Sequence, residues 1–346
     1  MFKDEIIILS FASVVISVIL VILLFYLMIR KTIENNRSRK IKVIKDEMNP
    51  KLYDFLVEGN VVRSLQPNTT LKKIALEELL LRYSETIEGE GERQNIQKLA
   101  ELHLKNYYRK GLTSLIWSKR MNALFHIEDL RVKSLTEDVI KALQSNRMTN
   151  EELILAFRIL ASFEYSDIFP LLQSKWDRLT EYDFRSILSR LSDSMFESFI
   201  LQFHHCPNGM KFAILEVISI KRDSNYINFL ETTFSKGEGE LRLRALKSIS
   251  SIGYCSNVKL FLPLVHSSVW QERMLTARIL GNLREKEHIP LLKKLLSDRV
   301  WYVRYQAGQS IMMFPNGKEI LREICETSVD PFSKDMASEW IYKGEI

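Results

Sequence analysis

Glycine, proline and cysteine are all scarce in this chain of 346 residues, which contains 12 glycines, 8 prolines and 3 cysteines. Because glycine and proline are the poorest helix formers, their scarcity permits long runs of helix. The cysteines Cys206, Cys255 and Cys325 lie far apart and form no CxxC pair, which excludes a zinc knuckle and a redox dithiol. We expect three free thiols in a reducing compartment.

Motifs of nucleotide binding and hydrolysis are absent from the sequence as well. There is no Walker loop, GxSxG, HExxH or GxGxxG. His204-His205-Cys206 is the one cluster of metal-capable side chains. Neighbouring helical residues point about 100° apart, and no further ligand lies at a recognisable spacing. We therefore predict no catalytic residue, no metal and no cofactor.

One long apolar run lies near the N-terminus. Residues 6–29 carry no charge, and as a helix they would cover about 36 Å, enough for a bilayer core of about 30 Å. Asp4 and Glu5 precede the run and no small-x-small cleavage site follows it, which disfavours a cleaved signal peptide. We predict a transmembrane helix over 6–29 after a short external N-terminus, 1–5.

Positive charge is concentrated directly after this run. Between residues 30 and 45, Glu34 is the one acidic residue, and the basic residues are Arg30, Lys31, Arg37, Arg39, Lys40, Lys42 and Lys45. Because positive charge beside a span stays in the cytoplasm, we expect a single-pass cell-membrane protein with its N-terminus outside. The segment 30–50 is predicted to be a basic juxtamembrane segment that can contact anionic lipid. It should end at Asn49-Pro50, because a residue before proline avoids the helical conformation.

The C-terminal part of the sequence repeats with a period of 31 residues. Three arginines at that spacing are each followed by a small or short residue at +3 and by an aliphatic residue at +7. The aligned residues are Arg242, Arg273 and Arg304, then Ala245, Thr276 and Ala307, then Ile249, Leu280 and Ile311. The spacing is that of one helix face, and a second apolar segment begins at +16, so each unit should contain two helices.

Weaker copies of this spacing occur upstream, starting near Lys72, Arg120, Leu153, Glu181 and Lys211. We predict an all-α solenoid of about eight helical pairs over 51–346, as one continuous domain with its first helix over 51–63. The acidic segment 85–93, which contains two glycines, is predicted to be a surface loop. An incomplete last unit, with Asp335 in the arginine position, is expected to act as a cap.

This pattern resembles the HEAT repeat family, whose second helix carries an arginine, an alanine and then an aliphatic-glycine pair. Leu280-Gly281 matches that pair, whereas Ile249-Ser250 and Ile311-Met312 depart from it. The resemblance implies a structural ladder between neighbouring repeats in which the repeat arginines, Arg242, Arg273 and Arg304, bind acidic partners. Asp298 stands where such a partner is expected, but Ser267 and Lys236 occupy the matching positions of the earlier units, so we expect a partial ladder.

Trp270 and Trp301 both lie three residues before a repeat arginine. They could form a stacking platform for bases or a peptide, or fill the contact between repeats.

The expected function is that of a non-catalytic scaffold or adaptor that binds another protein. We expect that partner protein to be membrane-associated. The alternatives are a HEAT-like enzyme of the lyase or hydroxylase type and a nucleic-acid-binding solenoid. Glu287-His288 reverses the His-Glu dipeptides of such hydroxylases, and a membrane tether makes nucleic acid an unlikely ligand. Solenoids usually bind through their concave face, to which the +1, +2 and +5 positions are assigned. The predicted partner-binding residues are Arg158, Arg244, Lys247, Arg278, Tyr305 and Gln309.

Overall fold

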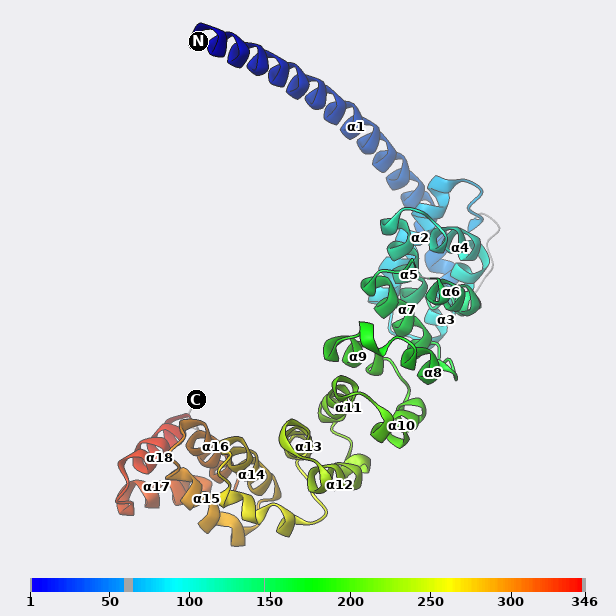
Figure 1. The fold of residues 1–346 in the computed structure, drawn as a ribbon. Coiled ribbons are helices and arrows are strands. Elements are labelled where there is room, and N and C mark those ends of the chain that lie inside the picture. The colour runs from blue at the N-terminus through cyan, green and yellow to red at the C-terminus, as the bar shows by residue number, and fades with distance from the viewer. Residues whose placement is uncertain (1, 59–64, 146, 344–346) are drawn as a thin grey trace. The chain divides into compact units, whose positions relative to one another are not determined.

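The computed structural model describes residues 2–58, 65–145 and 147–343 (Figure 1). These residues form α-helices and short 3₁₀ helices, with no strand among them, which confirms the predicted all-α class. The chain divides into two compact units, Met1–Phe163 and Glu164–Ile346. The border falls inside the range 51–346, and no proline-rich or Gly/Ser-rich sequence marks it.

The first unit contains seven α-helices among its described residues. They are α1 (Phe2–Glu58), α2 (Thr70–Thr86), α3 (Glu90–His103), α4 (Lys105–Leu112), α5 (Trp117–Asp129), α6 (Thr136–Gln144) and α7 (Asn150–Ser162). The helices of the second unit are α8 (Ile168–Gln173), α9 (Glu181–Leu188), α10 (Asp193–Leu201), α11 (Asn208–Lys221), α12 (Ile227–Lys236), α13 (Gly239–Ile252), α14 (Trp270–Leu283), α15 (Ile289–Leu296), α16 (Trp301–Met312), α17 (Gly317–Thr327) and α18 (Pro331–Lys343).

Helix α1 continues through Pro50, so the helix end predicted at Asn49-Pro50 is wrong. Proline inside a helix costs about 3 kcal/mol, because it removes a backbone donor and crowds the preceding turn. Beyond it, Leu52, Phe55 and Leu56 are 0%, 6% and 1% exposed where α1 packs against α2 and α3. Burying three such side chains contributes about 1.5–3 kcal/mol each, which outweighs the cost of the proline.

Two further predicted boundaries change for related reasons. The first helix expected over 51–63 is the C-terminal end of α1, and residues 59–64 lie outside the described part of the chain. The surface loop expected over 85–93 is confined to three residues, because α2 extends to Thr86 and α3 begins at Glu90. Glu90 and Glu92 in the first turn of α3 interact favourably with the helix dipole, so the acidity that suggested a loop stabilises a helix start.

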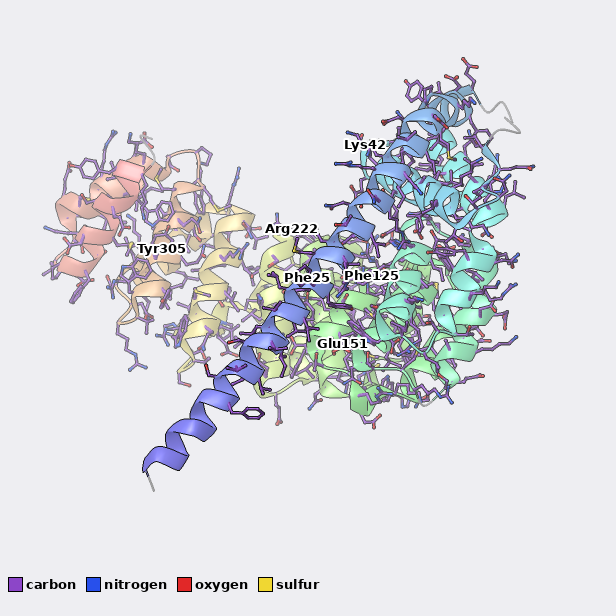
Figure 2. All side chains as sticks on the ribbon, turned by 90° about the horizontal axis from the view of Figure 1, so that it is seen from above. Phe25, Lys42, Phe125, Glu151, Arg222 and Tyr305 are labelled. Atoms are coloured by element: carbon purple, nitrogen blue, oxygen red, sulfur yellow. The ribbon has the colours of Figure 1, made fainter. Side chains whose placement is uncertain are left out.

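No residue in the hydrophobic window of α1 that the structure describes is buried inside the protein. Every large apolar side chain from Val14 to Ile29 is exposed, and the hydroxyl of Ser17 donates to the Ser13 carbonyl of the same helix at 2.9 Å. Figure 2 labels Phe25 within this apolar run and Lys42 nearer the end that joins the first unit. The helix is long and apolar enough to cross a membrane.

The 31-residue period appears directly in the second unit. Helices α13, α14, α16 and α18 begin at residues 239, 270, 301 and 331, at intervals of 31, 31 and 30 residues. Each of these helices packs against the next. Ala245, Thr276 and Ala307 are 0% exposed. The segment after α13 forms the 3₁₀ helices Val258–Leu260 and Leu262–His266 in place of the expected α-helix. Pro263, which lacks a backbone donor, lies in the second of these.

Close packing of two helices requires the glycine of the aliphatic-glycine pair. A Cβ atom on Gly281 would lie 2.4 Å from the Cβ of Ser310, so only glycine lets α14 and α16 approach this closely. Leu280 and Ile311 are both 0% exposed in the core that these helices share with α15, α17 and α18. Their predicted core positions are confirmed.

Substituting Leu280 tests this core. Leu280→Ala is expected to lower the free energy of unfolding by about 2–5 kcal/mol, through lost burial and a cavity. Hydrogen exchange on the detergent-solubilised chain should show lost protection in α14, α15 and α16 first, because each repeat contacts only its neighbours. Val329→Ala is the control, since Val329 is 97% exposed and should leave stability unchanged. Equal loss of protection throughout both units would contradict this nearest-neighbour behaviour.

Candidate partner-binding surfaces

Arg273 forms the most complete contact between successive repeat helices. Its Nε donates to Asp298 Oδ2 at 2.6 Å and its Nη2 to Asp298 Oδ1 at 2.8 Å. Its Nη1 donates to the Ser267 carbonyl at 2.8 Å. Burial alone would raise the pKa of Asp298, but the hydrogen bonds from Arg273 and the Val300 amide hold that pKa below its ordinary value. Asp298, at the expected ladder position, thus binds the repeat arginine of the preceding unit.

The ladder continues in the other units with glutamate in place of aspartate. Arg242 Nε donates to Glu272 Oε1 at 2.9 Å, and Arg120 Nε donates to Glu152 Oε1 at 2.6 Å. Both glutamates lie on the next repeat helix, whereas the sequence pattern predicts the partner in the loop before that helix. Arg304 ends the series: its Nη1 binds the Asp298 carbonyl at 2.8 Å, but its Nε is buried without a hydrogen-bond partner.

The predicted binding cations are largely neutralised by carboxylates of their own unit. Arg158 on α7 pairs with Glu128 on α5 at 3.0 Å. Lys247 on α13 lies 3.5 Å from Glu216 on α11. The carboxylates that pair with them were missed, because the sequence pattern assigns residue positions to helix faces without showing which neighbouring side chains meet. Each such pair reduces the positive potential that an acidic ligand would meet.

Arg244 is paired twice. Its Nη1 donates to Glu181 on α9, and its Nε donates to Glu240 on its own helix at 2.7 Å. The guanidinium also lies over the ring of Phe212, 4.8 Å from the centroid. Arg244 therefore connects α9, α11 and α13, which is a structural role.

Arg278 and Gln309 retain more capacity for a ligand. Arg278 is half-buried on α14, and it has no ion-pair or hydrogen-bond partner among the residues that the structure describes. Gln309 is exposed on α16 and accepts a hydrogen bond from Gln306 at 3.0 Å. Of the predicted cations on the second unit, Arg278 is the one with an uncompensated charge.

Five aromatic rings form a continuous row across α14, α16 and α18. Trp270 stacks on Tyr302 with centroids 5.4 Å apart, and Trp301 stacks on Tyr305 at 4.9 Å. Trp301 also meets Tyr302 edge-on at 5.3 Å, and Trp340 lies 4.9 Å from Tyr305. Tyr305 is labelled on α16 in Figure 2. Trp270 thus stacks between two repeat helices, whereas Trp301 stacks on a tyrosine of its own helix and is still 46% exposed.

Trp117 occupies the same position in the first unit, three residues before Arg120. It is 47% exposed, and its Nε1 donates to the Thr149 hydroxyl at the start of α7 at 3.3 Å. The three-residue offset from the repeat arginine is the sequence signal that identifies Trp117 as the equivalent residue.

A cluster of buried polar groups lies between α2, α4 and α5. Glu77 Oε1, the Tyr108 hydroxyl and His126 Nδ1 are buried without hydrogen-bond partners, and His126 Nε2 is 3.9 Å from Glu77 Oε1. Burial raises the pKa of Glu77 to about 7, against the opposing effect of the nearby Tyr108 hydroxyl, and Glu78 adds to the rise. Burial also lowers the pKa of His126, which Asp129 opposes.

Glu77 should make the first unit less stable as pH rises. Its folded pKa, about 7, lies above the ordinary value of 4.5, so its contribution is present below pH 4.5 and is lost as pH rises toward 7. One such proton changes the free energy of unfolding by at most about 1.4 kcal/mol per pH unit.

Glu77→Gln should remove this dependence, measured as the difference in unfolding free energy between variant and wild type across that window. Taking the difference between variant and wild type separates the effect of Glu77 from that of His126. The lowered pKa of His126 makes the folded state more stable as pH rises, which is the opposite direction. Glu88→Gln, at an exposed position, should leave the profile unchanged. Parallel profiles for Glu77→Gln and wild type would show that Glu77 is ionised throughout.

The structure also shows where the candidate metal-binding residues and the three cysteines lie. His204 and His205 lie in the 3₁₀ helix Phe203–His205, and no cluster of three possible metal ligands occurs among the described residues. Cys206 and Cys255 are buried and Cys325 is half-buried. Burial raises the pKa of the Cys206 and Cys255 thiols to about 11, so neither is a ready nucleophile.

Comparisons with known proteins add little to this geometry. No protein-family model and no curated protein matches the chain. Among solved structures, the crystal structure of an engineered protein is similar at 16% sequence identity, with 78% of each chain covered and a TM-score of 0.25. No family assignment follows from these matches.

Proposed function

We propose that this chain is a membrane-anchored adaptor whose helical pairs form a HEAT-like solenoid that binds another protein. The observation that carries the proposal is the dual character of α1. Its side chains from Val14 to Ile29 are exposed and apolar, whereas Ile41, Met48 and Leu52 are buried in the first unit. One helix thus offers a surface suited to lipid and a surface that belongs to a folded unit, with no linker between them.

The distance along α1 limits which basic residues could contact lipid. From Ile29 to Ile41 the helix advances about 18 Å, and the screening length at physiological salt is about 8 Å. On an upright helix Arg30 and Lys31 lie at the headgroups, whereas Arg37 lies about 12 Å beyond Ile29. Lys45 is already paired with Glu78 on α2 at 2.7 Å. We therefore propose that lipid contact within residues 30–45 is confined to the first two cations.

The proposed orientation places the N-terminus outside and both units in the cytoplasm, because the seven basic residues follow the apolar run. In a variant without native cysteines, Asp335→Cys should resist a membrane-impermeant maleimide in intact cells and react after lysis. Lys3→Cys should react in both. Asp335 is exposed, so protection reflects the membrane and not burial. Labelling of Asp335→Cys in intact cells would reverse the proposed orientation.

Protein binding is tested at Arg278, the uncompensated cation of the predicted surface. Arg278→Glu should reduce recovery of co-purifying proteins from mild detergent, measured by quantitative mass spectrometry, at unchanged abundance and melting temperature. The control is Lys259→Glu, at an exposed position of the same unit, which changes the net charge equally. If both variants recover the same proteins as the wild type, the second unit does not use this face.

A further inference from the structure

The strongest unassigned feature is a cavity of about 700 Å³ in the first unit. It lies at the C-terminal ends of α4 and α6 and against the loops that follow them. Its charged lining consists of Arg109, Arg120, Asp138, Lys141 and Arg147. This volume is within the range of small-ligand sites in proteins, about 300–1,000 Å³.

Two of the four cations are already neutralised. Arg109 Nε donates to Asp138 Oδ1 at 3.0 Å and its Nη2 to Asp138 Oδ2 at 3.2 Å. Arg120 is held by Glu152 through the ladder contact. Lys141 and Arg147 are both exposed, and neither has an ion-pair or hydrogen-bond partner among the described residues. The cavity therefore presents two uncompensated positive charges.

The rest of the lining combines hydroxyl-bearing residues with apolar side chains. Leu112 and Leu124 are 6% and 0% exposed, whereas Leu115, also in the lining, is 87% exposed. Arg120 Nη1 donates to the carbonyls of Ser114 and Leu115 at 2.9 and 3.2 Å. The ladder arginine thereby fixes the backbone of the loop that carries Leu115 before any ligand arrives.

We propose that this cavity binds a short acidic segment of a protein partner that also carries an aliphatic side chain. The two free cations would attract its carboxylates, and Leu115 would cover its aliphatic group. No aromatic side chain lines the cavity among the described residues, which disfavours nucleic-acid bases, because these are usually held by stacking. This inference rests on the proposed adaptor function and names the chemistry of the partner.

The test measures fluorescence anisotropy of an eight-residue, fluorescein-labelled peptide of alternating glutamate and leucine. The full chain is held in nanodiscs of neutral phosphatidylcholine. Saturable, salt-sensitive binding is expected, and it should be lost when glutamine replaces glutamate or serine replaces leucine in the peptide. Lys141→Glu combined with Arg147→Glu should weaken binding about tenfold or more, and Leu115→Ser should weaken it several-fold. These side chains are exposed, so the fold should survive, as circular dichroism would verify.

Matched controls lie on the same unit. Lys98→Glu with Lys133→Glu makes the same change in net charge at exposed positions outside the cavity lining, and Leu102→Ser removes a leucine that is 72% exposed. Both control variants should bind the peptide as the wild type does. Absence of saturable binding, or equal weakening by the control pair, would overturn the proposal.

A lipid headgroup is the competing anion. If the cavity variants lose binding to phosphatidylglycerol vesicles but keep binding to the peptide, the cavity is a lipid site and the proposal is wrong. An unchanged set of co-purifying proteins with the cavity variants would remove this cavity from the adaptor function. The loss of those proteins with Arg278→Glu would still support the function itself.

Discussion

The repeat arginine Arg273 connects three parts of the protein at once. In Arg273, one guanidinium nitrogen binds the carbonyl of the loop before its own helix, and the others bind a carboxylate of the next repeat unit. The carbonyl of a loop residue lacks a helical partner and needs a donor, and a repeat unit must also fix its angle to the next. The same side chain does both here. Arg120 repeats the arrangement in the first unit, with Glu152 and the Ser114 carbonyl.

The arginine contacts also explain why the tryptophans remain partly exposed. Trp117, Trp270 and Trp301 each form the first residue of a helix, three residues before the arginine. At that position a ring lies outside the core, and those of Trp117 and Trp270 reach the adjacent repeat helix. Trp117 bonds the Thr149 hydroxyl, and the other two stack on tyrosines. The rings of Trp117 and Trp270 therefore extend the contact between repeats outward from the repeat arginine.

The sequence predicts the parts of this fold that depend on period alone. Burial of Leu280 and Ile311 follows from the spacing of apolar residues, because one helix face must be apolar wherever a helix packs. Pro50 shows where prediction from local sequence fails. Its preference for ending a helix is outweighed by the burial of Leu52 and Phe55 against α2 and α3, and the local sequence does not reveal those contacts. Glu272 shows another limit. This carboxylate lies five residues after the expected position, Ser267, and still binds Arg242, because long side chains reach several positions. The cavity beside Lys141 depends on loops whose paths no periodicity determines.

Because α1 is a single helix, the apolar run and the core of the first unit keep a fixed angular phase. Each residue added between Arg30 and Lys40 would turn that unit by about 100° about the helix axis and move it by about 1.5 Å along the axis. The number of residues in this stretch therefore sets the rotational orientation of the unit about the axis of α1. A flexible tether would leave that direction undefined, whereas here it is encoded as a count of residues.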